Sequence, residues 1–453
     1  MKSFKTIILA AGEGTRMKSK KPKVFHELFH TPMICYVIKA AKDCNTEALC
    51  VVVGHKAEEV KKAIGNRDVT FTLQQQQLGT GHAVMQAIDF IEDDKNILIL
   101  YGDTPLITKE SLQELLLFHE KENNNVSIVS TVLENPAGYG HIIRDEKGNF
   151  LKNVEHKDAS ETEKQVKEIN TGIYCFKGAD LKKALSQLTN NNAQGEYYLP
   201  DTLEIILQYG GKVNALVTTD ASAFFGVNSR AQLAQAIAIM QKRINKKHME
   251  NGVTILSPEN TWIDPEAEIG QDTILYPNTI IEGNTVIGQD CTIGPNAKLT
   301  NMIIGDEVQL QYSVAMNSTI GNCANIGPFA YIRPDCNIGD GVKVGDFVEV
   351  KNSTVGNGTK IPHLTYVGDT DAGEKINFGC GSITVNYDGN KKHRTVVEDN
   401  VFVGCNANLV APVTIKKGSY IAAGSTITRD VPEQVLAVAR ARQQTIEGWV
   451  KKH

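Results

Sequence analysis

The sequence predicts an α/β domain and a parallel β-helix, joined by one helix, in a chain of 453 residues. Three patterns lead to this prediction. Strand and helix patterns alternate over residues 1–228, residues 229–250 have helical periodicity, and Ile, Val or Leu returns every six residues between 263 and 427. A chain of this length is expected to form two or three domains. We therefore expect domains at 1–228 and 251–453, with a linker helix at 229–250.

The N-terminal part has the alternation that is typical of α/β proteins. Short apolar runs, with helical patterns between them, predict strands at Thr6–Ala11, Ala48–Val53, Asn96–Leu100 and Val126–Val132. This alternation predicts a Rossmann-like, mainly parallel sheet with helices packed on it. The linker helix carries apolar residues at helical spacing, namely Leu233, Ile237, Met240 and Ile244.

A six-residue apolar period dominates the C-terminal part. It fits neither the 3.6-residue period of a helix nor the two-residue period of a strand, and hexapeptide repeats are typical of a parallel β-helix. The repeated side chains are expected to point into a narrow interior and to stack from coil to coil. They are Ile263, Ile269, Leu275, Ile281, Ile287, Ile293 and Leu299, then Val308, Val314, Ile320, Ile326, Ile332, Ile338, Val344 and Val350, then Val355, Ile361 and Val367, and finally Val397, Val403, Leu409, Ile415, Ile421 and Ile427.

Glycines and breaks in the period locate corners and loops. Gly often follows the repeated residue, as at Gly270 and Gly288, and is expected to supply the backbone angles of a corner. Extra residues are expected to leave the coil as loops at three places: Leu299–Val308, Val367–Ile383 and Asn386–Arg394. Because the ends of a solenoid need caps, residues 430–453 are expected to cap the C-terminal end.

The composition excludes several classes of function. The formal net charge of −5 gives no bulk attraction for nucleic acid or an anionic membrane. Nine cysteines without CxxC spacing favour a reducing compartment over a disulfide framework or a zinc site. The apolar run Ile7–Ala11 is too short for a signal peptide, and no stretch approaches the length of a membrane span. We therefore expect a cytoplasmic protein.

A glycine-rich turn follows the first predicted strand. It reads Gly12-Glu13-Gly14-Thr15-Arg16-Met17, and Pro22-Lys23 comes shortly afterwards. Backbone N–H groups in such a turn can approach phosphates closely. The turn lacks the GK[ST] ending of a Walker A loop, and Met17 replaces the last glycine of GxGxxG. Thr-Arg-Met together with Pro-Lys resembles the signature of the sugar-1-phosphate nucleotidyltransferases.

A carboxylate and a second glycine-containing turn extend this site. Asp103 follows the apolar strand Asn96–Leu100, and α/β sheets bind ligands at the carboxyl ends of their parallel strands. Mg²⁺ uses few protein carboxylates together with substrate phosphates, so Asp103 is a candidate metal ligand. Gln74 and the turn Leu78–His82 are suited to a base and a ribose.

The predicted β-helix carries a second group of polar residues. Arg333 and Lys351 lie 18 residues apart, which is one coil of three six-residue sides. They are therefore expected to stack on one face as a pair of cations suited to a phosphate. A single His in a solenoid is more often structural, but His363 follows Lys351 on an adjoining side, and the interruption at 386–394 projects a loop that can reach across.

With these motifs the whole chain resembles a family of bacterial bifunctional enzymes, which combine N-acetylglucosamine-1-phosphate uridyltransferase and glucosamine-1-phosphate acetyltransferase activities. The stretch Asn190–Tyr198 is also typical of this family. The resemblance implies a left-handed β-helix and a homotrimer with acetyl-transfer sites shared between subunits. It implies small-molecule substrates, without nucleic acid or membrane partners.

The resemblance also implies the residues of the first site. Asp103 and Asn228 hold Mg²⁺, while Arg16 and Lys23 neutralise charge during uridylyl transfer. The residues that bind UTP and UDP-N-acetylglucosamine are Leu9, Ala10, Ala11, Gly12, Lys23, Gln74, Gly79, Thr80, Tyr101, Gly102, Asp103, Gly140, Glu155, Asn170 and Asn228. Two residues depart from the usual pattern of the family: Glu13 stands where Lys is common, and His141 where Arg is common.

The same resemblance assigns the second site. His363 is the general base, and the ordinary imidazole pKa of about 6.5 suits that task; Asn386 orients the base or the amine. Glucosamine-1-phosphate is bound by Arg333, Lys351, Tyr366 and Asn377, and acetyl-CoA by Cys380, Asn386, Tyr387, Cys405, Ala423 and Arg440. Cys380 and Cys405 stand where relatives often carry Ala and Ser, and the simpler interpretation is that both are small buried residues rather than reactive thiols.

The implied function is a bifunctional enzyme that makes UDP-N-acetylglucosamine. It acetylates glucosamine-1-phosphate with acetyl-CoA, then transfers UMP from UTP to N-acetylglucosamine-1-phosphate and releases pyrophosphate. One alternative is a single-activity sugar-1-phosphate nucleotidyltransferase with a regulatory or trimerising β-helix, which Arg333, Lys351 and His363 argue against. Another is a non-catalytic assembly protein with a nucleotide-sensing head, which Asp103 and the glycine-rich turn argue against.

Overall fold

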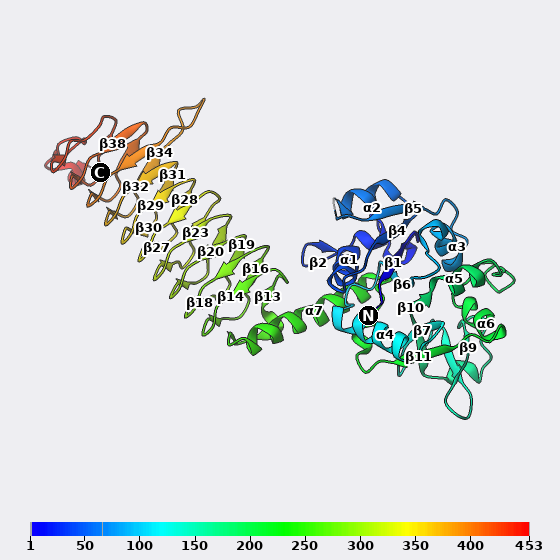
Figure 1. The fold of residues 1–453 in the computed structure, drawn as a ribbon. Coiled ribbons are helices and arrows are strands. Elements are labelled where there is room, and N and C mark those ends of the chain that lie inside the picture. The colour runs from blue at the N-terminus through cyan, green and yellow to red at the C-terminus, as the bar shows by residue number, and fades with distance from the viewer. Residues whose placement is uncertain (1, 66, 453) are drawn as a thin grey trace. The chain divides into compact units, whose positions relative to one another are not determined.

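The computed structural model describes residues 2–65 and 67–452. The chain divides into two units, Met1–Met240 and Gln241–His453. The division falls inside helix α7, Arg230–Glu250, which confirms the helix predicted at 229–250. Figure 1 shows an α/β fold in the first unit and stacked short strands in the second.

The first unit is built on a sheet with strand order β11-β7-β10-β6-β1-β4-β5. Strand β1 pairs in parallel with β4 and β6, whereas β10 runs antiparallel to both β6 and β7. The predicted, mainly parallel sheet is confirmed, and the four predicted strands shift by at most two residues at their ends. The strands are β1 Phe4–Ala10, β4 Leu49–Val53, β5 Thr70–Leu73, β6 Asn96–Tyr101, β7 Val126–Val132, β8 His141–Arg144, β9 Phe150–Val154, β10 Glu168–Lys177 and β11 Val213–Val217.

Helices cover both faces of this sheet, so its central strands are buried on both sides. Within β1, Ile8 packs in one apolar cluster and Ile7 in another on the opposite face, which explains the continuous apolar runs of these strands. The helices are α1 Met33–Asp43, α2 Ala57–Ile64, α3 Thr80–Met85, α4 Lys109–Lys121, α5 Gly178–Leu185 and α6 Asp201–Gln208. Short 3₁₀ turns at η1, Thr15–Met17, and η2, Lys23–Phe25, follow β1.

The second unit is a β-helix of three parallel sheets. Successive strands along the chain belong to successive sheets, so each coil has three sides. The first sheet contains β12 Thr254–Ile255, β15 Ile274–Leu275, β18 Thr292–Ile293, β21 Gln309–Leu310, β24 Asn325–Ile326, β27 Lys343–Asp346, β30 Lys360–His363, β33 Asn377–Phe378, β36 Phe402–Val403, β39 Tyr420–Ile421 and β41 Leu436–Ala437.

The second sheet contains β13 Trp262–Ile263, β16 Ile280–Glu282, β19 Lys298–Thr300, β22 Val314–Met316, β25 Tyr331–Ile332, β28 Glu349–Lys351, β31 Tyr366–Gly368, β34 Ile383–Val385, β37 Asn408–Val410 and β40 Thr426–Ile427. The third contains β14 Glu268–Ile269, β17 Val286–Ile287, β20 Ile303–Ile304, β23 Thr319–Ile320, β26 Asn337–Ile338, β29 Thr354–Val355, β32 Thr370–Ala372, β35 Thr395–Val397 and β38 Val413–Ile415. Between them, the sheets enclose a single apolar core.

The repeated aliphatic residues form this core as predicted, except between Leu299 and Ile320. There the inward strand positions are Ile304, Leu310 and Ala315, so the predicted core position Val314 is wrong, whereas Val308 does belong to the core, although it does not lie in a strand. Val308 is buried at a corner, and Val314 is only half-buried. Three sides of this stretch have five residues instead of six, so the coil shortens and no loop leaves it at Leu299–Val308.

The other two predicted loops have different outcomes. At Val367–Ile383 the prediction is wrong, because Val367, Ala372 and Phe378 continue the core without an insertion. At Asn386–Arg394 it is confirmed: a β-bridge joins Tyr387 to Lys392, and the coil resumes with β35 on β32.

Two glycines after the repeated residues, Gly294 and Gly327, have positive φ as predicted, but others have a different role. At Gly270 an added Cβ would lie 2.5 Å from the carbonyl carbon of Gly288 in the next coil. Glycine is needed there because two backbones approach closely, rather than because φ is positive. The left-handed corner residues stand two positions later, as at Asp272 and Asp290, and Asn and Asp tolerate that conformation better than most residues.

The C-terminal segment caps the solenoid only in part. Strand β41 pairs with β39, and Val431 is buried. Farther along, Leu436, Ile446 and Trp449 are exposed. All nine cysteines are free. Within the described residues, no helix has the length and apolar character needed to cross a membrane.

The revised core positions can be tested by substitution. Leu310→Ala is expected to destabilise the β-helix by about 2–5 kcal/mol, because it opens a cavity in a packed core. Val314→Ala, in the next strand but half-buried, is expected to cost about 1 kcal/mol or less. Chemical denaturation of the full chain measures both changes. A larger effect of Val314→Ala than of Leu310→Ala would instead support a strict six-residue register through this stretch.

Candidate active sites

Two cavities open at the carboxyl ends of β1 and β6. Their volumes are about 270 and 370 Å³, and they share the wall residues Lys23, Thr80, Tyr101, Asp103 and Glu196. Every residue predicted to bind UTP or UDP-N-acetylglucosamine lines one of them, with one exception. The exception is Gly102, where an added Cβ would lie 3.1 Å from Val24 Cγ1.

The glycine-rich turn brings Lys23 to the centre of this site. Gly14 has a φ of +64°, and an added Cβ there would lie 2.5 Å from the Cβ of Lys23, so the sequence needs glycine where the two segments cross. The Lys23 ammonium donates to Asp103 Oδ2 and, at 2.9 Å, to Asn228 Oδ1. Arg16 Nη2 also donates to Asn228 Oδ1, at 2.9 Å.

The two predicted metal ligands therefore converge on one cationic group. Asp103 is nearly buried, and its backbone carbonyl accepts a hydrogen bond from Val227, the neighbour of Asn228, at 2.8 Å. Within residues 2–65 and 67–452, no cluster of three or more His, Cys, Asp or Glu could hold a metal. A carboxylate and an amide oxygen fit a hard cation such as Mg²⁺, whose remaining ligands are substrate phosphates and water.

The second glycine-containing turn is held from both sides. Gln74 Nε2 lies 3.1 Å from the Gly79 carbonyl oxygen and 3.0 Å from His82 Nδ1. Gly79 has a φ of +109°, and an added Cβ would lie 2.5 Å from the Tyr197 carbonyl oxygen. The backbone N–H of Leu199 donates to Thr80 Oγ1 at 3.1 Å. The turn is thereby fixed against residues 190–199.

Buried hydrogen-bonding groups line the second cavity. Asn170 lies beside a register shift in β10, and its Nδ2 donates to Tyr174 Oη at 2.7 Å and to Asn153 Oδ1 at 3.1 Å. Burial raises the pKa of the Glu155 carboxyl and of the Tyr101 hydroxyl. These groups can hydrogen-bond a polar ligand that displaces water from the cavity.

Sequence reasoning missed several residues of these walls. Gln194, Glu196 and Tyr198 line the cavities and belong to the family-typical stretch Asn190–Tyr198, which carried no assigned role. The sequence signal that could have identified them is that they belong to a segment typical of the family. Gln77, Thr104, Tyr139, Thr171, Gly172, Tyr174 and Gly226 also line the cavities, and the sequence analysis gave none of them a role.

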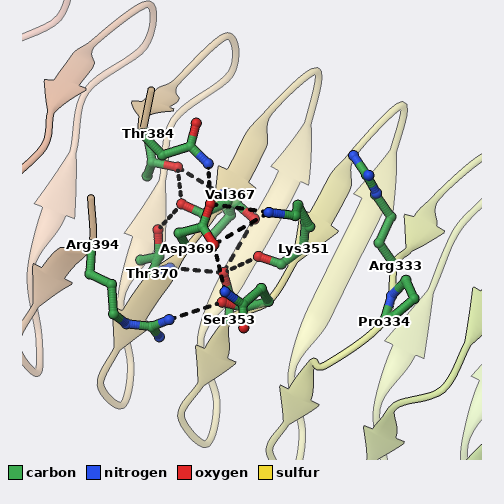
Figure 2. Close-up of polar contacts among 12 residues, drawn as sticks. Arg333, Pro334, Lys351, Ser353, Val367, Asp369, Thr370, Thr384 and Arg394 are labelled. Atoms are coloured by element: carbon green, nitrogen blue, oxygen red, sulfur yellow. Dashed lines mark hydrogen bonds and ion pairs between the residues drawn. The ribbon is translucent and has the colours of Figure 1, made fainter. Parts of the chain in front are cut away.

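The predicted cation pair of the β-helix is in register. Ile332 pairs with Val350, so Arg333 and Lys351 stand at the same position on neighbouring coils. Figure 2 shows Lys351 reaching toward Asp369, with Arg333 one coil away. Lys351 Nζ lies 3.2 Å from Asp369 Oδ2, and Arg333 Nη1 lies 2.8 Å from Glu349 Oε1. Each cation thus has a carboxylate partner in the described structure.

Asp369 is the hub of this polar cluster. Partial burial works against its ionisation, but hydrogen bonds from Asn352, Lys351 and Asn386 outweigh burial and lower the pKa of the carboxyl. Asn386 Nδ2 also donates to Tyr366 Oη at 3.2 Å. The structure therefore connects the predicted residues Lys351, Tyr366 and Asn386 through an acid that sequence reasoning missed.

His363 is held by Asp346, an acid to which the sequence analysis gave no role. Its Nδ1 donates to Asp346 Oδ1 at 2.6 Å, and this hydrogen bond lowers the pKa of the Asp346 carboxyl. Asn386 instead donates to Tyr366 and Asp369. With Nδ1 bound to a carboxylate, Nε2 of a neutral imidazole carries the lone pair that a general base needs.

A constant register stacks five residues along one corner of the β-helix. Asp346 pairs with His363. In the next coil, paired residues are 17 positions apart both before and after the corner, because Lys360 pairs with Asn377 and Tyr366 with Ile383. The same spacing places Cys380 beside His363. The same argument carries the stack onward through the later coils. We call this stack the corner column; its members are Asp346, His363, Cys380, Cys405 and Ala423.

Exposure in the corner column corrects the simpler interpretation of the cysteines. Cys405 is exposed and Cys380 is half-buried, so neither is a buried core residue. Both stand two positions after an inward-facing residue, Phe378 or Val403, so their side chains leave the core.

The remaining predicted residues lie near this corner or in the loop at Asn386–Arg394. Asn377 belongs to β33, and Tyr387 is exposed, with its hydroxyl donating to the Gly389 carbonyl at 2.8 Å. An added Cβ at Gly424, next to Ala423, would lie 4.0 Å from Arg440 Cδ. Of the two departures in the first unit, Glu13 is exposed, whereas His141 is buried between the Val166 carbonyl and His156.

Asp346 offers a direct test of the second site. Asp346→Asn is expected to lower the turnover number of acetyl transfer by about tenfold or more, with little change in KM, because an amide cannot stabilise a protonated imidazole as a carboxylate does. Steady-state kinetics measure the effect. Asp272→Asn, at an exposed corner of an early coil, is the matched control. An unchanged turnover number for Asp346→Asn would show that Asp346 takes no part in the reaction.

Comparison with known families gives a match to each unit. The model of the family "Nucleotidyl transferase" matches residues 5–265, and the model "Bacterial transferase hexapeptide (six repeats)" matches residues 266–301, 317–352 and 394–429. The unmatched stretch 302–316 overlaps the three five-residue sides between Leu299 and Ile320. The stretch 353–393 contains most of the loop at Asn386–Arg394. The stretches that the hexapeptide model does not match are therefore those where the six-residue repeat is irregular.

Similar curated proteins extend over both units. The chain is 52% identical over 453 residues to "Bifunctional protein GlmU" of Acetivibrio thermocellus, 56% identical over 452 residues to the protein of that name from Thermoanaerobacter pseudethanolicus, and 54% identical over 452 residues to that from Caldanaerobacter subterraneus. Each alignment covers 100% of this chain and 98% of the relative.

Proposed function

The chain belongs to the family of the bifunctional GlmU proteins, and from this premise we propose how each of its two sites works. It is a bifunctional enzyme of UDP-N-acetylglucosamine synthesis, with uridylyltransferase and acetyltransferase activities. We assign uridylyl transfer to residues 1–228 and acetyl transfer to residues 251–453. The observation that carries this assignment is the presence of two built polar sites, one around Lys23 and one around His363.

In the first site, a phosphate oxygen of N-acetylglucosamine-1-phosphate attacks the α-phosphorus of UTP, and pyrophosphate leaves. The glycine-rich turn and the cations Arg16 and Lys23 bind and neutralise the triphosphate. Gln74, Gly79 and Thr80 position the nucleotide, while Glu155, Asn170 and Gly140 bind the sugar. Asp103 and Asn228 would hold Mg²⁺, which when bound neutralises phosphate charge.

In the second site, the amine of glucosamine-1-phosphate attacks the thioester carbonyl of acetyl-CoA. His363 takes the proton from the amine at Nε2, while Asp346 holds Nδ1. Arg333 and Lys351 bind the sugar phosphate in place of part of their present carboxylate contacts, and Tyr366 and Asn377 contact the sugar. Acetyl-CoA lies against the corner column, together with Asn386, Tyr387 and Arg440.

The assembly and location are also proposals. Three flat sides with hexapeptide repeats favour packing of the β-helix into a homotrimer, in which neighbouring subunits would complete the acetyl-transfer site. Nine free cysteines favour a reducing compartment, so we place the enzyme in the cytoplasm. The alternative of a single-activity nucleotidyltransferase is not favoured, because relatives named bifunctional align over essentially the whole chain.

An assay of the full chain tests the proposal. With glucosamine-1-phosphate, acetyl-CoA, UTP and Mg²⁺ together, we expect UDP-N-acetylglucosamine, free coenzyme A and pyrophosphate. Omitting acetyl-CoA should stop product formation, and supplying N-acetylglucosamine-1-phosphate should restore it. Uridylylation of that acetylated sugar with no acetylation of the free amine would support the single-activity alternative instead.

A further inference from the structure

Two accessible cysteines follow the proposed base along the corner column, where acetyl-CoA is proposed to lie, but neither reaction uses the chemistry of their thiols. We propose that Cys405 and Cys380 form a thiol–disulfide exchange site for the disulfide of coenzyme A, and that their oxidation switches off acetyl transfer. The inference rests on the proposed acetyl-transfer function, because it requires coenzyme A to bind along the corner column.

The backbone holds the two cysteines at the spacing of neighbouring strands. Gly379 N donates to the Val403 carbonyl at 2.7 Å, and Asn406 N donates to the Cys380 carbonyl at 2.8 Å. These bonds enclose both cysteines, so their coils keep the strand spacing of about 4.8 Å. Disulfides join Cα atoms about 4.4–6.8 Å apart. The backbone spacing of the two cysteines therefore falls within the Cα range of disulfides.

Accessibility separates these cysteines from six of the other seven. Cys405 is exposed and Cys380 is half-buried. Six others are buried, namely Cys35, Cys44, Cys50, Cys175, Cys291 and Cys336. Cys323 is the other exposed cysteine, and desolvation together with the nearby Glu307 carboxylate raises the pKa of its thiol. Cys323 therefore reports reaction at an exposed thiol outside the corner column.

The proposed acetyl transfer brings the sulfur of coenzyme A close to Cys380. For His363 to take a proton from the attacking amine, the thioester carbonyl must lie within a few ångströms of the imidazole. The sulfur of coenzyme A is bonded to that carbonyl carbon, so it lies near the coil that follows His363 in the corner column. Cys380 belongs to that coil, and Cys405 belongs to the next one. A disulfide of coenzyme A bound in the same way presents its sulfur to these thiols.

The exchange is balanced in two steps. The Cys405 thiolate attacks one sulfur of the coenzyme A disulfide, so the S–S bond breaks, one coenzyme A thiolate leaves, and a mixed disulfide forms on Cys405. The Cys380 thiolate then attacks the Cys405 sulfur and releases the second coenzyme A. Two cysteine thiols are oxidised to one disulfide, one coenzyme A disulfide is reduced to two thiols, and the cysteine protons pass to the leaving thiolates.

Oxidation should inhibit one activity only. The mixed disulfide fills the place of acetyl-CoA, and the Cys380–Cys405 disulfide changes the surface beside His363. The residues of the uridylyl-transfer site are not members of the corner column, so that activity should persist. The enzyme would then stop consuming acetyl-CoA when the coenzyme A pool becomes oxidised, and a reducing thiol would restore it.

The experiment compares two disulfides on the reduced full-length protein. We expect coenzyme A disulfide to oxidise Cys380 and Cys405 about tenfold faster, or more, than glutathione disulfide at equal concentration, because binding raises the effective concentration of the reacting sulfur. Intact mass and peptide mapping identify the products. Acetyl transfer should fall in step with oxidation, uridylyl transfer should stay unchanged, and dithiothreitol should restore the lost activity.

Substitutions separate the two steps. Cys380→Ala should accumulate the mixed disulfide on Cys405, whereas Cys405→Ser should react at least about tenfold more slowly, because the exposed attacking thiol is missing. Each variant is compared with its own untreated acetyl-transfer activity. The control Cys323→Ser should oxidise at the wild-type rate.

Three results would overturn the proposal: equal reaction of Cys323 and Cys405 with coenzyme A disulfide, equal rates with both disulfides, or full acetyl transfer after complete oxidation. Lack of acetyl transfer in the untreated enzyme would instead contradict the proposed function, and mass measurement would still score the exchange separately.

Discussion

His363→Ala is expected to lower acetyl transfer by about 100-fold or more while leaving uridylyl transfer near the wild-type rate. General bases commonly contribute about 100-fold to 10,000-fold. His363 is half-exposed at a corner, and its imidazole makes a side-chain hydrogen bond to Asp346. Its removal should therefore cost chemistry rather than folding. Separate assays of coenzyme A release and pyrophosphate release measure the two activities.

The uridylyl-transfer rate of the same preparation is the internal control for His363→Ala. A second control is Leu364→Ala, which truncates an exposed neighbour at the same corner and should leave the turnover number of acetyl transfer within about twofold, since substitutions on the exposed surface have small effects. Equal loss of both activities in His363→Ala would contradict the two-site assignment. Full retention of acetyl transfer would show that another group takes the proton.

Asp103→Asn is expected to have the converse effect, with a loss of uridylyl transfer of about 100-fold or more because a charged ligand and its electrostatic stabilisation are removed. Asparagine keeps an oxygen for the Lys23 ammonium, which now contacts Asp103 Oδ2. The fold of the site should therefore survive. Initial rates of pyrophosphate release over a range of Mg²⁺ concentrations measure the change.

The matched control is Asp68→Asn, which removes a carboxylate from a fully exposed position of the same unit and should leave the Mg²⁺ dependence unchanged. Acetyl transfer should be unaffected in both variants. If Asp103→Asn kept the wild-type rate and the wild-type Mg²⁺ dependence, Asp103 would be removed from the proposed metal site, and Asn228 and the substrate phosphates would have to suffice.

Local patterns carried most of the fold prediction. The alternation of apolar runs located β1, β4, β6 and β7 within two residues, because strands buried on both faces read as continuous apolar segments. The prediction failed between Leu299 and Ile320, where sides of five residues replace sides of six. Stacking requires one inward residue for each side, not a fixed number of residues, so Leu310 and Ala315 continue the core.

Residue contacts over long separations lay beyond the sequence patterns. Asp346 escaped notice because an acid at a solenoid corner has no local signal, and only the parallel register sets it beside His363. The exposure of Cys405 was missed for a similar reason, since hydrophobicity alone suggests burial for a small residue. Asp369 gathers Lys351 and Asn352 from one neighbouring coil and Asn386 from another.

The amino-acid sequence by itself determined the order of the two folds, the three-sided coil and the identity of the glycine-rich turn, because periodicity and turn chemistry act over a few neighbouring residues. Only the tertiary structure decided which groups meet: Lys23 with Asp103 and Asn228, and the corner column from Asp346 to Ala423. The physical reason is that backbone pairing and packing bring together residues that are far apart along the chain, and their contacts depend on register rather than on local composition.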